Sequence, residues 1–192
     1  MKKILITLGV LLVVAMVVFI PYNSIISKDQ AVQASWAQVE TDYQRRSDLI
    51  PNLVATVKGV ASFEQETLTN VVEARAKATG IQLNANDLTS EKIAQFENAQ
   101  TDLSGALSRL LVVAEAYPTL TASESFRGLQ TQLEGTENRI AVSRKDFNTV
   151  VQSYNTTIKR FPTNITAKIF NFTEKAYFES VQGADEVPAV EF

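Results

Sequence analysis

The sequence predicts an all-α protein, in which an N-terminal single-pass transmembrane helix is followed by an antiparallel, four-helix-like bundle of long helices. The chain opens with a long uncharged apolar run, and its later apolar residues recur at alternating spacings of three and four. Only 7 of its 192 residues are Gly and 5 are Pro. This spacing is the heptad pattern of coiled-coil-like helices packed along an apolar stripe. We therefore expect an anchor over residues 1–21, a bundle over 22–178 and an acidic tail over 179–192.

The N-terminal run predicts a membrane anchor. Lys2 and Lys3 precede seventeen residues without charge, residues 4–20. A helix of that length spans roughly 25 Å, near the lower limit for a bilayer crossing. The run ends in bulky residues, whereas a signal peptidase needs small ones, so we interpret it as an uncleaved signal-anchor. The two lysines favour a cytoplasmic N-terminus, which places the bundle on the extracytoplasmic or periplasmic side of the inner membrane.

The composition excludes several kinds of chemistry. The chain has no Cys, so it forms no disulfide and carries no lipid-modified cysteine. It has no His, which removes the usual metal ligand and the usual general base at neutral pH. We expect no enzyme activity and no cofactor. The formal net charge of −3 also argues against nucleic acid as a partner.

The first bundle helix carries the longest apolar stripe, and the charged Arg46 lies on it. Pro51 has no amide to bond the Ser47 carbonyl, so we expect this helix to kink or break near residues 47–51, with Asp48 capping the part that restarts. The helix then continues to about Thr79, where Gly80 ends it. The positions of the stripe are Val32, Trp36, Val39, Tyr43, Arg46, Ile50, Leu53, Val57 and Val60.

Three further helices follow. The second is expected from Thr89 or Ser90 to Pro118, with polar Gln100 on its stripe. A capping box formed by Thr121 and Glu124 opens the third, which runs to Pro162 and whose stripe is diluted by polar residues between 136 and 144. A shorter helix covers about residues 164–178.

Helix lengths suggest where these elements meet. A second helix antiparallel to the first returns about 42 Å, which brings Glu115 beside the segment from Arg45 to Pro51. Arg46 then either extends its charged end to water or forms an ion pair, with Glu115 or Asp48 as the partner.

Two aromatic residues share the stripe of the first helix. Trp36 and Tyr43 are interpreted as core residues, with exposed anchors for a partner as the alternative.

Several motifs carry a resemblance to a known family. They are Tyr22-Asn23 after the apolar run, Trp36, the segment Arg-Arg-Ser-Asp-Leu-Ile-Pro-Asn-Leu-Val at 45–54, the run 107–118 and Tyr154-Asn155. In order and spacing this chain resembles the LemA family of bacterial membrane-anchored helical proteins, from Tyr22 to about Phe178. The resemblance implies a helical fold and a membrane anchor, but no activity.

These observations predict a non-enzymatic scaffold or adaptor in the bacterial cell envelope, with an envelope protein as a possible partner. The alternative is a binding module that presents ligands or substrates to a membrane enzyme, and family resemblance suggests a protease. We also expect a homo-oligomer, because the stripe of the first helix is longer than the helices available to cover it. Folding back at Pro51 is the competing explanation.

Overall fold

The computed structural model describes residues 2–59, 63–85 and 88–179, without the side chains of residues 10 and 12–18, and its regular structure in these ranges is entirely helical. The all-α prediction is therefore confirmed. The expected tail beyond residue 179 and the stripe position Val60 lie outside the described residues. The helices are α1 (Lys2–Lys58), α2 (Gln65–Gly80), α3 (Ser90–Ala114), α4 (Pro118–Thr121), α5 (Glu124–Lys159) and α6 (Thr163–Ile169).

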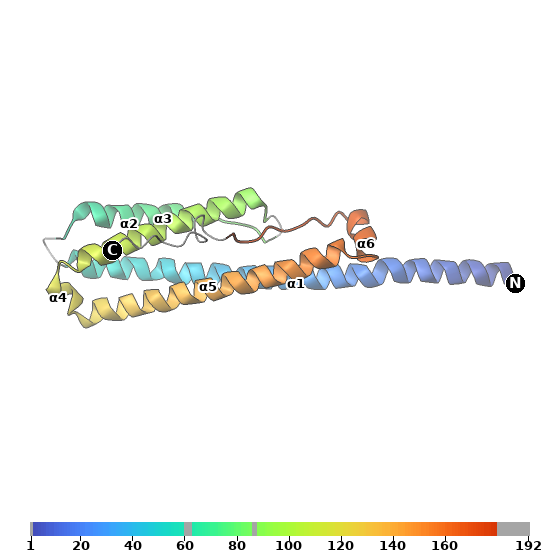
Figure 1. Cartoon of the computed structure of the whole chain (residues 1–192), viewed down its shortest axis with the longest axis horizontal. Helices are drawn as coiled ribbons and strands as arrows, with labels where there is room; N and C mark the ends of the chain where they lie inside the picture. The colour runs from blue at the N-terminus through green and yellow to red at the C-terminus, as the bar shows by residue number, and fades with distance from the viewer. Residues whose placement is uncertain (1, 60–62, 86–87, 180–192) are drawn as a thin grey trace, which may run out of the picture.

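The bundle is built around α1 (Figure 1). From the C-terminal end of α1 the chain turns back into α2, and α3 runs antiparallel to α2 and therefore in the same direction as α1. The short α4 makes the corner into α5, which returns along the length of α1. Next, α6 packs against both α1 and α5 at the opposite end of the bundle.

The first helix differs from the prediction in two respects. It continues through Pro51 without a break, and it ends at Lys58 instead of running on to Thr79. The Ser47 carbonyl, which Pro51 cannot bond, accepts a hydrogen bond from Arg75 Nε on α2 at 2.9 Å. Because a neighbouring helix supplies the missing donor, α1 keeps its helical course.

Other helix ends agree better with the sequence. α2 ends at Gly80 and α3 begins at Ser90, as predicted, and Thr89 Oγ1 accepts a hydrogen bond from the Lys92 amide. The predicted capping box is wrong. α5 does begin at Glu124, but its N-cap residue is Ser123 and makes no side-chain cap.

Two predicted helices are shorter than expected. α3 ends at Ala114, and Pro118 instead opens α4, where its missing amide costs nothing. The last helix ends at Ile169, and residues 172–179 are extended.

The extended segment, residues 172–179, is held against α5 by hydrogen bonds between α5 side chains and its own backbone. The side-chain amide of Asn155 both donates to and accepts from the backbone of Lys175, at 2.8 and 3.0 Å. One heptad earlier, Asn148 makes the same pair of bonds to Phe178, each at 2.9 Å. Tyr154 donates to a third carbonyl of the segment at 3.0 Å. The segment is therefore fixed along the bundle.

The apolar stripe of α1 is buried within one chain. Val32 and Val39 are fully buried, Trp36 is 1% exposed and Tyr43 6% exposed. Their cover comes from α5, the start of α3 and the extended segment, in a cluster that includes Phe96. Neither self-association nor folding back at Pro51 is needed to cover the stripe, so the length of the stripe is no evidence for a homo-oligomer.

The N-terminal part of α1 projects beyond the other elements (Figure 1). Its described large apolar side chains are between 61% and 71% exposed: Ile4, Leu5, Ile6, Leu8, Leu11, Phe19 and Ile20. Judged on the described residues alone, none of the helices combines the length and apolarity of a membrane span.

Candidate functional site: a buried arginine layer and an adjoining pocket

Arg46 is the centre of a polar layer inside the bundle. It is 1% exposed, because its position on the stripe of α1 directs it toward α3 and α5. Its Nη1 atom lies 2.8 Å from Glu137 Oε1 on α5 and donates to Ser104 Oγ on α3 at 2.8 Å. Its Nη2 atom donates to the side-chain and backbone oxygens of Gln100. The guanidinium is thus an ion-paired, hydrogen-bonded crosslink between three helices.

The ion pair confirms one of the two readings of Arg46, but the predicted partners are wrong. Glu115 is exposed at the C-cap of α3. Asp48 is also exposed and accepts a hydrogen bond from the Gln44 amide one turn earlier. Arg45, the neighbouring arginine, is exposed too. The error follows from the direction of α3, because a helix parallel to α1 places residues 100–104, and not residue 115, opposite Arg46.

The layer separates two apolar clusters of the core. On one side lie the end of α1, α2 and the second half of α3, from Ile50 to Leu133. On the other side lie Trp36, Tyr43 and the second half of α5. Trp36 is enclosed by three phenylalanine rings, and Phe178 of the extended segment stacks on it with ring centroids 5.9 Å apart. Both aromatic residues of the stripe are therefore core residues, as interpreted.

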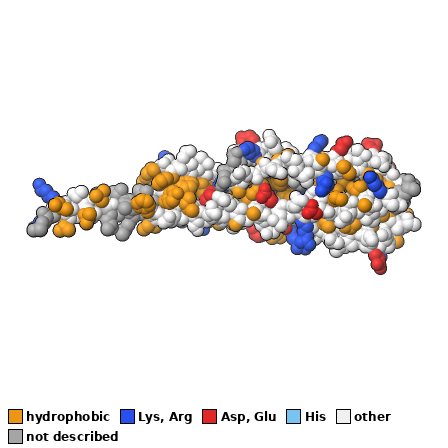
Figure 2. All heavy atoms as spheres, turned by 180° about the vertical axis from the view of Figure 1, so that it is seen from behind, with side chains coloured by type: hydrophobic (Ala, Val, Ile, Leu, Met, Phe, Trp, Pro, Cys, Tyr) orange, Lys and Arg blue, Asp and Glu red, His pale blue; other side chains and the backbone are white. Residues whose placement is uncertain are grey.

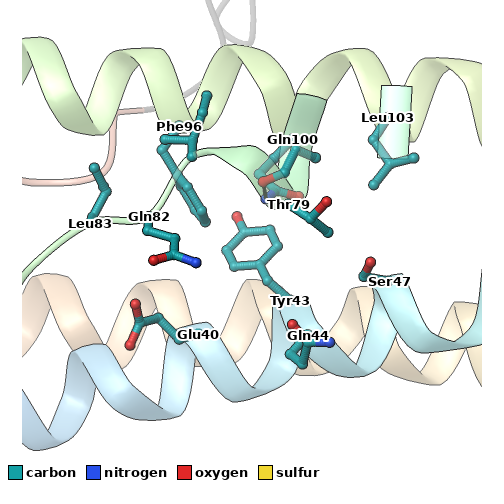
Figure 3. A pocket seen from close by; sticks show the side chains of 12 residues that line it. Glu40, Tyr43, Gln44, Ser47, Thr79, Gln82, Leu83, Phe96, Gln100 and Leu103 are labelled. Carbon is teal, nitrogen blue, oxygen red and sulfur yellow. Dashed lines mark hydrogen bonds between the residues drawn. The ribbon is translucent and has the colours of Figure 1, made fainter. Parts of the chain in front are cut away.

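A pocket of about 310 Å³ adjoins the layer. Figure 3 shows it between α1, α3 and the chain that follows α2. Tyr43 and Phe96 meet edge to face in it, with centroids 4.9 Å apart. Amide and hydroxyl groups form much of the remaining lining, together with one carboxylate. The lining side chains include Glu40, Gln44, Ser47, Thr79, Gln82, Leu83, Gln100 and Leu103.

Two hydroxyl groups give the pocket its chemical character. Ser47 is 3% exposed, and its hydroxyl has no hydrogen-bond partner within the described part of the chain. Burial raises the pKa of Tyr43, and the nearby positive charges of Arg144 and Arg46 partly offset this effect. The Tyr43 hydroxyl is consequently a neutral group at physiological pH. Such a pocket is suited to a small ligand that hydrogen-bonds and carries little negative charge.

The site offers no obvious catalytic device. Its serine hydroxyl has no base beside it, since the chain has no histidine and Ser47 makes no hydrogen bond in the described structure. Among the described residues, no group of three or more acidic side chains is placed to hold a metal ion. The geometry can hold helices together and bind a ligand.

Sequence reasoning did not assign Gln100, Glu137 or Arg75 to this region as partners. Gln100 stands as a polar residue on an apolar stripe, which was a usable signal for burial beside a charge, whereas Glu137 is exposed. Arg75 gave no such signal, because its role depends on a carbonyl 28 residues earlier in the chain.

Comparison with known proteins shows which sequences this chain is similar to. The model of the LemA family matches residues 35–192. Magnetosome protein MamQ 2 of Paramagnetospirillum magneticum is 28% identical over 202 residues, covering 94% of this chain and 74% of that protein. Magnetosome protein MamQ of Magnetospirillum gryphiswaldense is 26% identical, with 95% and 74% covered. Protein LemA of Metamycoplasma hominis is 23% identical, with 82% and 68% covered.

Proposed function

Because this chain belongs to the LemA family, we propose that it is a membrane-anchored, non-enzymatic scaffold or adaptor of the bacterial cell envelope. The observation that supports the proposal is the projecting part of α1. Its exposed apolar side chains have no cover in the bundle, and a lipid bilayer is the environment in which such a helix is stable. The anchor comprises residues 1–21, and the bundle faces the extracytoplasmic side, as the lysine pair favours.

The interior of the bundle supports a mechanical role. The Nη1 and Nη2 donors of Arg46 are directed to oxygens on two other helices, so the layer fixes the register of α1 against α3 and α5. A bundle with a defined register presents a constant outer surface. That property is useful to a scaffold.

The anchor is tested by the mature protein itself. We expect an intact mass that includes residues 1–21. We also expect the protein to stay in the membrane when membranes are washed with alkaline carbonate. In spheroplasts, protease added outside should digest the bundle. An intact mass that begins after residue 21 would disprove the anchor, and protection of the bundle would reverse the orientation.

The scaffold role and self-association need separate measurements. Light scattering of the detergent-extracted full chain gives its copy number, and a mass of one copy would remove self-association from the proposal. Chemical cross-linking in native membranes, followed by mass spectrometry, should recover an envelope protein bound to the bundle. If cross-links form only within the chain, the adaptor role fails.

The pocket beside Ser47 favours a second candidate, a module that binds a small ligand and presents it to a membrane enzyme such as a protease. Native mass spectrometry of the membrane-extracted protein should then show a bound small molecule. Thr79→Trp fills the rim of the pocket and should remove this adduct. Thr69→Trp, at an exposed position of the same helix, should leave it in place. A wild-type protein without any adduct would eliminate this candidate.

A further inference from the structure

A group of exposed apolar side chains lies where the projecting part of α1 enters the bundle. Figure 2 shows hydrophobic side chains gathered at this junction. We call this group the apolar collar. Its members are Phe19 (64% exposed), Ile20 (65%), Phe161 (81%), Ile165 (45%), Ile169 (61%) and Phe170 (45%).

Aromatic contacts hold the two parts of the apolar collar, one on α1 and one in and next to α6, side by side. Tyr22 of α1 packs against Phe170 and Phe172, which follow α6, with ring centroids 4.7 and 5.9 Å apart. Phe19 and Ile20 lie within one turn of Tyr22 and end the apolar run of α1. The exposed face of α6 is therefore held beside the last apolar turn of the projecting helix.

Basic side chains accompany the apolar collar. Arg160 precedes Phe161, and Lys168 lies between the apolar positions of α6. Both are exposed, and neither makes an ion pair with a described residue. Exposed aromatic and aliphatic side chains with lysine or arginine at their border are the pattern of a surface that enters the boundary between lipid headgroups and acyl chains.

We infer that the apolar collar is a second membrane contact, through which the base of the bundle is seated in the headgroup–acyl boundary of the bilayer that holds α1. The inference rests on the proposed anchor. Lipid is favoured as the occupant because the collar is continuous with the apolar surface of α1, so that a helix inserted up to Ile20 brings α6 to the lipid surface. The aromatic rings then occupy the interfacial depth that suits them.

Single-cysteine labelling tests this directly, since the chain has no cysteine of its own. The full chain, reconstituted in phosphatidylcholine–phosphatidylglycerol vesicles, carries a fluorophore at Phe161→Cys or Ile169→Cys. Two quenchers are compared: a lipid with a nitroxide near its headgroup, and iodide in the water. Val112→Cys is the matched control, because Val112 is equally exposed at 66% but belongs to the second half of α3, away from the collar.

We expect the nitroxide lipid to quench the two collar labels several-fold more than the Val112 label, and iodide to show the reverse order. Collar labels that respond only to iodide, as Val112 does, would overturn the inference. Labels shielded from both quenchers would also overturn it, because they would indicate that protein covers the collar.

A label at Leu8→Cys separates this inference from the anchor. If Leu8 is quenched by nitroxide lipid and the collar labels are not, the anchor stands and the second contact fails. If Leu8 is not quenched either, the proposed anchor fails as well.

A charge variant gives an independent check. Ile165→Glu combined with Ile169→Glu should abolish lipid quenching at Phe161→Cys while quenching at Leu8→Cys is retained. Both isoleucines are exposed, so the emission of Trp36 in the core should stay as in the wild type. Unchanged quenching at Phe161→Cys in this folded variant would count against seating by the collar.

Discussion

Removing either member of the ion pair between Arg46 and Glu137 should destabilise the bundle, but to unequal extents. The two side chains differ in burial, since that of Arg46 is 2% exposed and that of Glu137 is 45% exposed. Glu137→Leu leaves a buried guanidinium without its counter-ion, and losing one partner of a buried pair costs about 3–5 kcal/mol. Because this carboxylate is half exposed and partly screened by water, we expect the lower end, about 3 kcal/mol.

Arg46→Met has a different consequence. The carboxylate left behind can turn to water, and the main loss is an unpaired Gln100 side-chain oxygen, worth about 1–3 kcal/mol. We therefore expect Arg46→Met to cost roughly 1 kcal/mol less than Glu137→Leu. The double variant should cost less than the sum of the two, because no charge is left unpaired.

Urea unfolding of the full chain in detergent, followed through the emission of Trp36, measures all four states of this cycle. Glu134→Leu is the control, because exposed Glu134 accepts a hydrogen bond from Gln130 on the same helix, and it should change stability by less than about 0.5 kcal/mol. If Arg46→Met costs as much as Glu137→Leu, or if the coupling energy is near zero, the pair does not hold the layer together.

Three further outcomes follow from contacts described above. Pro51→Ala should stabilise α1 by about 1–3 kcal/mol. Arg75→Met should then lower the stability less in that variant than in the wild type, because the restored amide of residue 51 bonds the same Ser47 carbonyl as Arg75. Additive changes in the urea midpoint would contradict this. Asn155→Ala, which loses two bonds to the extended segment, should lower the free energy of unfolding by about 1–3 kcal/mol, whereas exposed Gln152→Ala should be neutral in the same assay. Burial, with a smaller contribution from Asp29, raises the pKa of Tyr154 from 10.0 to about 12, so its stabilising effect is complete below pH 10 and is lost as pH rises to 12. Absorbance at 295 nm should show a late tyrosine titration, to which Tyr43 also contributes, and Tyr154→Phe should reduce its amplitude; an unchanged late titration in that variant would refute the prediction.

The helix limits that were predicted correctly have strong local causes. Gly80 ends one helix and Thr89 caps the next, and both effects act within a few residues. The turn after Lys58 has a comparable local signal in Gly59, but the apolar spacing of α1 continues through Leu68 and Val71 as if the helix went on, and the prediction followed that spacing. Missing this one turn reversed the direction assigned to α3, and with it the position of Glu115.

The polar layer shows a second limit of local reasoning. The position of Arg46 on the stripe indicates burial, but its partner depends on which helices face it, and that is a property of the whole fold. The same is true of Pro51, whose effect on the helix was predicted from α1 alone. The carbonyl that Pro51 leaves without an amide donor is bonded by Arg75, which belongs to another helix.

The uninterrupted course of α1 has a geometric consequence for an anchored protein. From residue 21 to Lys58 the helix rises about 55 Å, so with the proposed anchor over residues 1–21 the corner at α4 would stand at that height above the bilayer when the helix is upright. No hinge separates membrane from bundle, and a tilt of about 10° in the lipid therefore moves the corner sideways by about 10 Å. A partner bound at α4 would then lie at a fixed distance above the membrane. Its lateral position would change with the tilt of α1, and this tilt depends on the thickness of the membrane.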